Sequence, residues 1–267
     1  MTGPGVTPVL LIGAGRMGQA LISGWKKSGA FDLADLMVRA PHINEGCAEA
    51  ARGGAVINPP DHEIAAARTV VLCVKPQKWR EIAPAYADVL GKGAVIISVL
   101  VGTRAADISG GFGGRPVARV LPTTAVATAS GVTSLYAPDP RALAAATTLF
   151  DPISTLVELA DEPLMDAAGA VSASGAAYVY AFARALEEAG AAAGLPAEAS
   201  KILARSTLAS AAAFMAACDG DPTDLIAQVA SPGGTTEAAL AVLDPALRRA
   251  MTDAVAAAVR RAQELAG

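Results

Sequence analysis

Two glycine-rich segments of this chain have the composition of ligand-binding turns. The first, at residues 13–18, reads Gly-Ala-Gly-Arg-Met-Gly, follows the apolar run Val9–Ile12 and precedes an amphipathic helical pattern. Gly13 permits a tight turn, Gly15 lets the backbone approach a pyrophosphate, and Gly18 lets the helix pack on the strand. The N–H groups and dipole at the helix N-terminus favour phosphates. This context predicts a dinucleotide site.

The end of the second expected strand indicates which dinucleotide fits. In NAD sites an Asp or Glu at this point bonds the ribose hydroxyls, but this chain has Arg39 after the run Leu36–Val38. A planar guanidinium can pair with the 2′-phosphate of NADPH. NADPH is therefore favoured and NADH stays possible. The alternative is that Arg39 faces solvent beside the adenine.

A third cofactor candidate follows the expected strand Val70–Val74. Val74, Lys75 and Pro76 stand where an open α/β sheet places ligands, at the carboxyl edge of its strands. Pro76 fixes the backbone as the chain turns across the cofactor. The alternative is a simple strand-to-helix turn from which Lys75 extends into solvent.

The second glycine-rich segment, Ser-Pro-Gly-Gly-Thr-Thr at residues 231–236, fits the anchoring of a small carboxylic acid. We expect Gly233 and Gly234 to expose backbone N–H groups just before a helix that includes Glu237. Donors at a helix N-terminus are a natural carboxylate site, and Ser231, Thr235 and Thr236 add hydroxyl groups. The alternative is an N-cap turn with no ligand.

The other chemically versatile side chains give weaker signals. His42 and His62 stand near expected surface turns, and neither is expected to act in acid–base catalysis. Cys73 ends an apolar strand, which favours an inert core thiol. The three cysteines lie far apart, which predicts a reducing compartment, no disulfide framework and no metal site.

Composition excludes several classes of protein. The 267 residues are 53% hydrophobic, 17% charged and 4% aromatic, with a net charge of −4. Such a chain is not intrinsically disordered and has no electrostatic footprint for nucleic acid. No apolar run reaches the roughly 18 residues of a membrane span, and the start lacks the pattern of a signal peptide. We therefore expect a cytoplasmic protein without nucleic-acid or membrane partners.

The elements that must position these segments divide the chain in two. Residues 1–162 alternate short apolar runs with helical patterns, as parallel βαβ units do. The expected strands are Val9–Ile12, Leu36–Val38, Val70–Val74, Ala94–Val99, Pro116–Leu121, Gly131–Tyr136 and Thr155–Leu159. The expected helices are Met17–Ser28, Ile43–Ala51, His62–Ala67, Gln77–Leu90 and Pro140–Phe150. This pattern predicts an α/β fold, a Rossmann-type doubly wound sheet.

Residues 163–267 are rich in alanine and nearly free of strand signals, which predicts an all-α domain of four or five helices. Small side chains bury little area within one subunit. Close packing against a second chain would bury more, so an intertwined dimer is expected. The alternative is a monomeric helical cap.

Six segments in order resemble pyrroline-5-carboxylate reductases over nearly the whole chain. They begin at Leu11 (LIGAGRMG), Val74 (VKPQ), Ile97 (ISVLVG), Arg119 (RVLP), Ser172 (SASGAAY) and Ser231 (SPGGTTE). The resemblance implies an N-terminal Rossmann domain, a C-terminal dimerisation domain, and NAD(P)H-dependent reduction of L-1-pyrroline-5-carboxylate to L-proline, the last step of proline biosynthesis. It implies a homodimer whose partner subunit completes the active site, and dimers that often gather into a decamer.

The resemblance also implies roles for individual residues. Thr236 matches the family's substrate-contacting threonine and is the candidate catalytic residue. The implied substrate site, for a cyclic imino acid, is Ser174, Gly175, Ser231, Gly233, Gly234, Thr235 and Thr236. The implied cofactor site is Gly13, Gly15, Arg16, Met17, Gly18, Arg39, Val74, Lys75, Pro76 and Thr123.

Three departures from the family pattern keep alternatives open. The family usually has Asn where this chain has Thr123, Pro where it has Ala176, and often Asn near the helix that starts around Pro60. The alternatives are a reductase of a related cyclic imine and a non-catalytic NADPH-binding paralogue. The β-hydroxyacid dehydrogenases are a more distant alternative, because Lys201 lacks the glycines that surround their lysine.

Overall fold

The computed structural model describes residues 5–218 and 220–266. The chain separates into two compact units, the first formed by residues 1–173 with 258–267 and the second by residues 174–257. The division expected from the sequence, after residue 162, stays a prediction.

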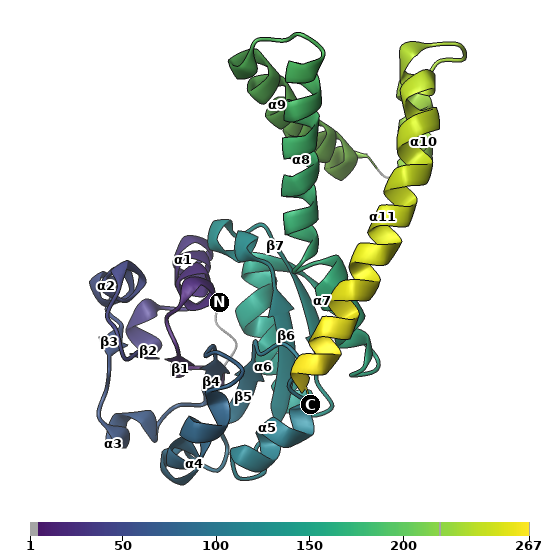
Figure 1. Ribbon diagram of the computed structural model, residues 1–267. Helices are drawn as coiled ribbons and strands as arrows, with labels where there is room; N and C mark the ends of the chain where they lie inside the picture. Colours follow the sequence, from purple (N-terminus) through teal and green to yellow (C-terminus); the bar gives the residue numbers. More distant parts are fainter. Residues whose placement is uncertain (1–4, 219, 267) are drawn as a thin grey trace. The chain divides into compact units, whose positions relative to one another are not determined.

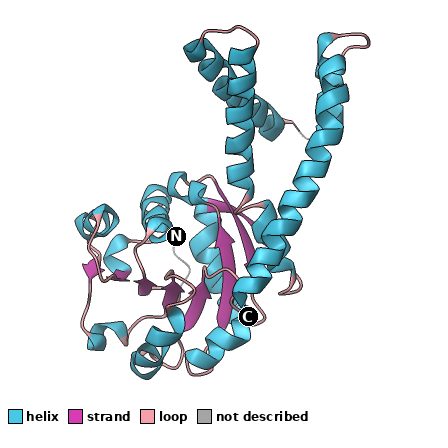
Figure 2. Ribbon diagram, in the orientation of Figure 1, coloured by secondary structure: helices cyan, strands magenta, loops and turns pink. Residues whose placement is uncertain are grey.

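The first unit is built on one eight-stranded sheet, drawn as magenta arrows in Figure 2. The strand order is β3-β2-β1-β4-β5-β6-β7-β8, and neighbours are parallel except β6 and β7. The strands are β1 (Val9–Ile12), β2 (Leu36–Arg39), β3 (Val56–Ile57), β4 (Thr69–Leu72), β5 (Val95–Ser98), β6 (Val117–Pro122), β7 (Gly131–Tyr136) and β8 (Ser154–Glu158). The expected doubly wound sheet is confirmed, and the two last strands extend it.

Helices lie on both sides of this sheet (Figure 1). They are α1 (Arg16–Ser28), α2 (Glu45–Arg52), α3 (Asp61–Ile64), α4 (Trp79–Val89), α5 (Ala105–Gly111), α6 (Pro140–Phe150) and α7 (Leu164–Val171), with 3-10 turns at Leu33–Asp35, Thr124–Thr128 and Asp151–Ile153. Helix α5 was not expected, because two of its seven residues are glycines. Burial of Ile108 and of Phe112 just after it accounts for the helix.

The core has two halves because successive side chains of a strand point to opposite faces of the sheet. In β1, Val9 and Leu11 join the cluster that contains Trp25 of α1. Leu10 and Ile12 join the other cluster, which contains Trp79 of α4. All four strand residues are at most 3% exposed, so the sheet is covered on both faces.

Arg115 ties two helix ends to the base of β6. Its guanidinium is buried and donates to the carbonyl oxygens of Ala87 (3.1 Å), Leu90, Gly91 (3.2 Å) and Phe112 (2.5 Å). These carbonyls stand at the carboxyl ends of α4 and α5, where a positive charge is favourable. Arg115 therefore fixes both helices against the sheet.

The second unit is entirely helical over its described residues. It contains α8 (Gly175–Ala192), α9 (Ala197–Ala217), α10 (Pro222–Val229) and most of α11 (Thr235–Ala266). Together with α7 these make five helices in the described residues after 163, within the four or five that the sequence predicted. Helices α8 and α9 pack at Gly190, where an added Cβ would overlap Ser200 Oγ, and that hydroxyl donates to Glu187 O at 2.6 Å.

None of the helices in the described residues is both long enough and apolar enough to cross a lipid bilayer.

Candidate functional site

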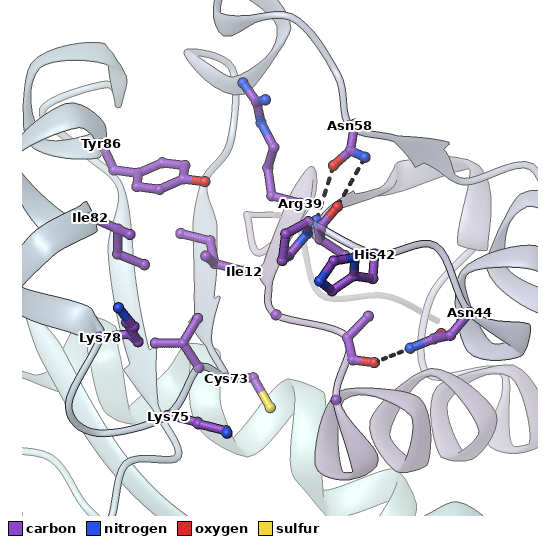
Figure 3. A pocket seen from close by; sticks show the side chains of 16 residues that line it. Ile12, Arg39, His42, Asn44, Asn58, Cys73, Lys75, Lys78, Ile82 and Tyr86 are labelled. Atoms are coloured by element: carbon purple, nitrogen blue, oxygen red, sulfur yellow. Dashed lines mark hydrogen bonds between the residues drawn. The ribbon is translucent and has the colours of Figure 1, made fainter.

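A cleft of about 950 Å³ opens at the carboxyl ends of β1, β2 and β4 (Figure 3). Five of the cofactor-site residues expected from the sequence line it, namely Gly13, Gly15, Arg39, Val74 and Lys75. The carboxyl edge of parallel strands is where open α/β sheets bind ligands. The structure therefore brings together the two expected cofactor segments and the end of the second strand.

The glycine turn has the geometry that the sequence predicted. Gly13 has a φ of +102°, and a Cβ there would overlap the carbonyl oxygen of Cys73. A Cβ on Gly18 would overlap the carbonyl oxygen of Gly13, so the helix approaches the turn as closely as only glycine allows. An added Cβ on Gly15 would meet nothing within 4 Å. Gly15 therefore leaves open space beside the N-terminus of α1, as a bound pyrophosphate requires.

Arg39 is the last residue of β2 and already has a partner within the chain. Its Nη2 lies 2.7 Å from Oδ1 of Asp61, the first residue of α3. The side chains of Arg39 and Asp61 are 31% and 71% exposed. Nε of Arg39 is buried without a hydrogen-bond partner among the described residues. Arg39 therefore lines the cleft with a guanidinium that is only partly paired, which fits a phosphate-bearing cofactor.

Two asparagines that sequence reasoning missed shape the rim of the cleft. Asn58 donates to Ala40 O (3.0 Å) and accepts from Ala40 N (2.9 Å), and its own φ is +52°. Asn44 donates to Ala14 O (2.6 Å) and caps α2 by accepting from Cys47 N (3.1 Å). Asn tolerates a positive φ, as at residue 58, and is a preferred N-cap residue, as at residue 44. The N-cap of α2 was readable from the sequence, whereas both contacts to residues far along the chain were not.

The facing wall comes from the segment after β4 and from α4, whose Ile82 and Tyr86 point into the cleft in Figure 3. Burial raises the pKa of Tyr86 and raises that of Cys73 to about 12. Cys73 is therefore a protonated thiol at neutral pH, but it is half-buried and lines the cleft, so it is not the core residue that the sequence predicted. His42 lines the cleft with an exposed side chain.

The remaining cofactor candidates do not line this cleft: Arg16, Met17, Gly18, Pro76 and Thr123. Thr123 follows β6, where its N–H donates to Val132 O (2.9 Å) and its Oγ1 accepts from Val132 N (3.0 Å). The hydroxyl proton of Thr123 can still be donated. The cofactor role of these five residues stays a prediction, as does that of the five that line the cleft.

The second glycine-rich segment forms a tight turn at the start of α11. Gly234 N donates to Ser231 O at 2.9 Å, and Gly233 has a φ of +72°. Gly233 N donates to Oε2 of Glu237 at 2.7 Å. The expectation that both glycines expose their N–H groups is therefore wrong within this chain, because the turn and the Glu237 carboxylate use them.

Helix α11 begins earlier than expected, at Thr235. Its first bond to a preceding carbonyl is from Ala238 N to Gly234 O. The N–H groups of residues 235–237 precede that bond and are the donors that a helix N-terminus leaves for a ligand. Thr236 stands among them.

Ser174 and Gly175, the other expected substrate residues, lie at the start of α8, where Ala177 N donates to Ser174 O at 2.9 Å. They share the second unit with the turn, whereas the cleft belongs to the first. Among the described residues, no group of three or more His, Cys, Asp or Glu side chains is placed to hold a metal ion.

A doubly wound sheet with a glycine turn at its carboxyl edge defines a dinucleotide-binding protein of the Rossmann class. Residues 8–102 match the family described as NADP oxidoreductase coenzyme F420-dependent. Residues 162–265 match the family described as pyrroline-5-carboxylate reductase dimerisation.

Individual proteins are similar to this chain over nearly its full length. A pyrroline-5-carboxylate reductase of Synechocystis sp. is 32% identical over 96% of this chain and 97% of its own. A pyrroline-5-carboxylate reductase structure from Coxiella burnetii is 27% identical, with a TM-score of 0.89 over 98% of this chain and 99% of that one. The chain belongs to the pyrroline-5-carboxylate reductase family.

A third relative bears on the fold. The Plasmodium falciparum pyrroline carboxylate reductase with NADP bound is 22% identical, with a TM-score of 0.84 over 99% of this chain and 100% of that one. At this identity the likeness concerns the fold. The dimerisation match supports a homodimer formed through the helical part of this chain.

Proposed function

We propose that this protein reduces L-1-pyrroline-5-carboxylate to L-proline with NADPH, and with NADH as a second possible donor. The observation that carries the proposal is that similarity to curated pyrroline-5-carboxylate reductases covers 96% of the chain. The matched length includes both the cleft of the first unit and the turn of the second. NADPH, when bound, supplies the hydride that reduces the carbon–nitrogen double bond.

The residues of the cleft would bind and orient the cofactor. Gly13 allows the tight turn, and Gly15 leaves open space beside the N-terminus of α1, where the pyrophosphate would receive N–H donors. Arg39 would bind the 2′-phosphate through its guanidinium. Val74 and Lys75 would border the nicotinamide half of the cofactor on the opposite wall.

The turn of the second unit would hold the substrate by its carboxylate. The N–H groups of residues 235–237 and the hydroxyl of Thr236 are the proposed donors, and Ser231 and Ser174 would contribute to the same site. Fixing the carboxylate fixes the ring, and positioning of this kind can contribute about 7–11 kcal/mol of barrier reduction in favourable cases. The imine is electrophilic once protonated, so no covalent lysine is needed.

Assembly and location complete the proposal. The cleft of one protomer would receive the turn of its partner, so that the homodimer is the smallest active form, and dimers would gather into a decamer. The protein would act in the cytoplasm on a small molecule. Equilibrium sedimentation of the protein with and without NADPH measures the assembly directly.

The reaction is tested by following NADPH oxidation with five-membered and six-membered cyclic imino acids. Faster turnover of the five-membered ring is the expected result. Preference for the six-membered ring would indicate a related imine reductase, an alternative that Thr123 and Ala176 favour because they depart from the family pattern. Tight NADPH binding without turnover of either ring would indicate a non-catalytic paralogue.

A further inference from the structure

The ion pair between Arg39 and Asp61 holds a carboxylate next to the guanidinium that is proposed to bind the 2′-phosphate of NADPH. Two negative charges would then lie at the same guanidinium. The two side chains join the end of β2 to the start of α3, with 2.7 Å between Nη2 and Oδ1. Arg39 lines the cleft, whereas Asp61 is not among the residues that line it and its side chain is 71% exposed. Any anion that binds this guanidinium therefore lies a few ångströms from the Asp61 carboxylate.

The fold does not require this pair. Exposed ion pairs contribute little to stability, and Asp61 begins a helix of only four residues. Asp61 has no other salt-bridge partner within 4 Å among the described residues. The Asp61 charge should therefore affect ligand binding at Arg39 more than the stability of the fold.

We infer that Asp61 weakens the preference of this cleft for NADPH over NADH, by opposing the 2′-phosphate and accepting a hydrogen bond from a ribose hydroxyl. The inference rests on the proposed function for the identity of the cofactor. A 2′-phosphate carries a charge of about −1.5 to −2 near neutral pH, so like-charge repulsion acts on NADPH alone. The ribose of NADH has hydroxyl groups, which a carboxylate binds well.

The position of Asp61 explains how one site can serve both cofactors. The end of β2 carries a cation where NAD sites have a carboxylate, and the carboxylate of this chain comes instead from α3. When a phosphate is absent, Asp61 neutralises the guanidinium and remains available to a hydroxyl. When a phosphate is present, the exposed Asp61 side chain can turn towards solvent while Arg39 keeps its position at the end of the strand.

An alternative role for Asp61 predicts the opposite change in the binding of a 2′-phosphate. If the carboxylate only held Arg39 in the orientation that binds phosphate, removing its charge would weaken the binding of a 2′-phosphate. If it opposes the phosphate, removing its charge strengthens that binding. Asp61→Asn separates the two roles, because Asn keeps the shape and an acceptor oxygen while losing the charge.

The experiment measures binding of adenosine 2′,5′-bisphosphate and of 5′-AMP by calorimetry, which does not depend on turnover. Asp61→Asn is expected to tighten the bisphosphate about fivefold at low salt, with less gain at high salt because screening weakens the repulsion. Binding of 5′-AMP should be unchanged or weaker. The matched control is Asp139→Asn, which removes the same charge from another Arg-paired Asp, 2.8 Å from Arg141 and not among the residues lining the cleft.

The outcomes distinguish this inference from the proposed function. If Asp61→Asn leaves the ratio of the two affinities unchanged or lowers it, while the wild type binds both nucleotides and reduces the imine, only the role of Asp61 is overturned. If the wild-type protein binds neither nucleotide, the cofactor assignment fails and the inference fails with it. A rise in the ratio in Asp61→Asn and not in Asp139→Asn supports the inference.

Discussion

The two units of this chain differ in how they bury apolar side chains. In the first unit, large residues such as Trp25, Phe112 and Phe150 are completely buried between the sheet and its helices. In the described residues of the second unit, 174–218 and 220–257, the buried residues are Ser200 and Ala204. Large apolar side chains there are exposed in the single chain: Val179, Tyr180, Leu186, Leu195, Ile202, Leu203, Phe214, Met215, Ile226, Val229, Val242 and Leu243.

The two units therefore obtain their stability from different sources. Apolar burial is the dominant favourable contribution to folding, and the first unit obtains it within one chain. Over the described residues of the second unit, the helices have apolar side chains but no core of their own. They therefore depend on the partner subunit, which agrees with the dimerisation match of residues 162–265.

The largest expected effect comes from placing a charge on the exposed apolar surface of α9. Ile202 is 56% exposed in the single chain, and we expect the partner to cover it. Ile202→Asp should dissociate the dimer, because an unpaired carboxylate taken out of water is destabilising by several kcal/mol and a two-fold interface contains it twice. Light scattering coupled to gel filtration measures the mass.

The control for this prediction is the same substitution in the first unit. Ile43 is 69% exposed there, and Ile43→Asp should leave the mass unchanged. A dimeric Ile202→Asp variant with unaltered circular dichroism would contradict the view that the second unit lacks its own core.

The next effect concerns the first unit alone. Arg115→Met removes the guanidinium that binds four carbonyl oxygens while keeping an apolar side chain of similar length. We expect a loss of about 3 kcal/mol in the free energy of unfolding, because a buried hydrogen bond to a charged group contributes about 1.5–3 kcal/mol. Chemical denaturation measures it, and the mass in solution should stay that of the dimer.

Arg141→Met provides the comparison for Arg115. Arg141 is exposed and pairs with Asp139, and this pairing lowers the pKa of that carboxyl to about 2. Its removal should have no measurable effect on unfolding near neutral pH, since exposed pairs contribute little. Equal losses for the two variants would mean that burial of Arg115 does not account for its contribution.

In the first unit, the sequence predicted most strands and helices but not all. Apolar runs bounded by glycine, proline or charge predicted β1, β2, β4, β5 and β6, because a strand buried on both faces must be continuously apolar. Strands β7 and β8, which are partly exposed, were expected as extensions of the same sheet. The missing strand, Val56–Ile57, is too short to give a signal. Helix α5 was missed for another reason: two of its seven residues are glycines, and tertiary packing of Ile108 overrides their low helix propensity.

In the site, local patterns were readable and contacts between distant segments were not. The glycine turn was predicted because Gly13, Gly15 and Gly18 act through the backbone next to them. The pairing of Arg39 with Asp61 joins residues that are 22 positions apart, and no local pattern indicates it. The use of Gly233 N by Glu237 was readable in principle, because a Glu in the first helical turn commonly reaches back to a backbone N–H before it.

The substrate half of the proposed site lies in the second unit, so a change there should affect the imine and not the cofactor. Thr236→Ala should weaken substrate binding or turnover by roughly 1.5–3 kcal/mol, the usual contribution of a hydrogen bond to a charged group. Steady-state kinetics with the imine measures this, while the affinity for NADPH should be unchanged. Thr236→Ser keeps the hydroxyl and should retain most of the activity; kinetics of Thr236→Ala equal to those of the wild type would remove the assignment.

The cofactor half lies in the first unit, and there the smallest effect is expected. Arg39→Ala should raise the Michaelis constant for NADPH about tenfold, because a bond to a phosphate contributes about 1.5 kcal/mol and the side chain is partly exposed to screening solvent. The constant for NADH should change little, since its ribose carries no phosphate. Equal changes for both cofactors would contradict the phosphate contact. A change in the Michaelis constant for the imine alone would assign Arg39 to the substrate, and the proposed division of cofactor and substrate residues between the two units would then be wrong.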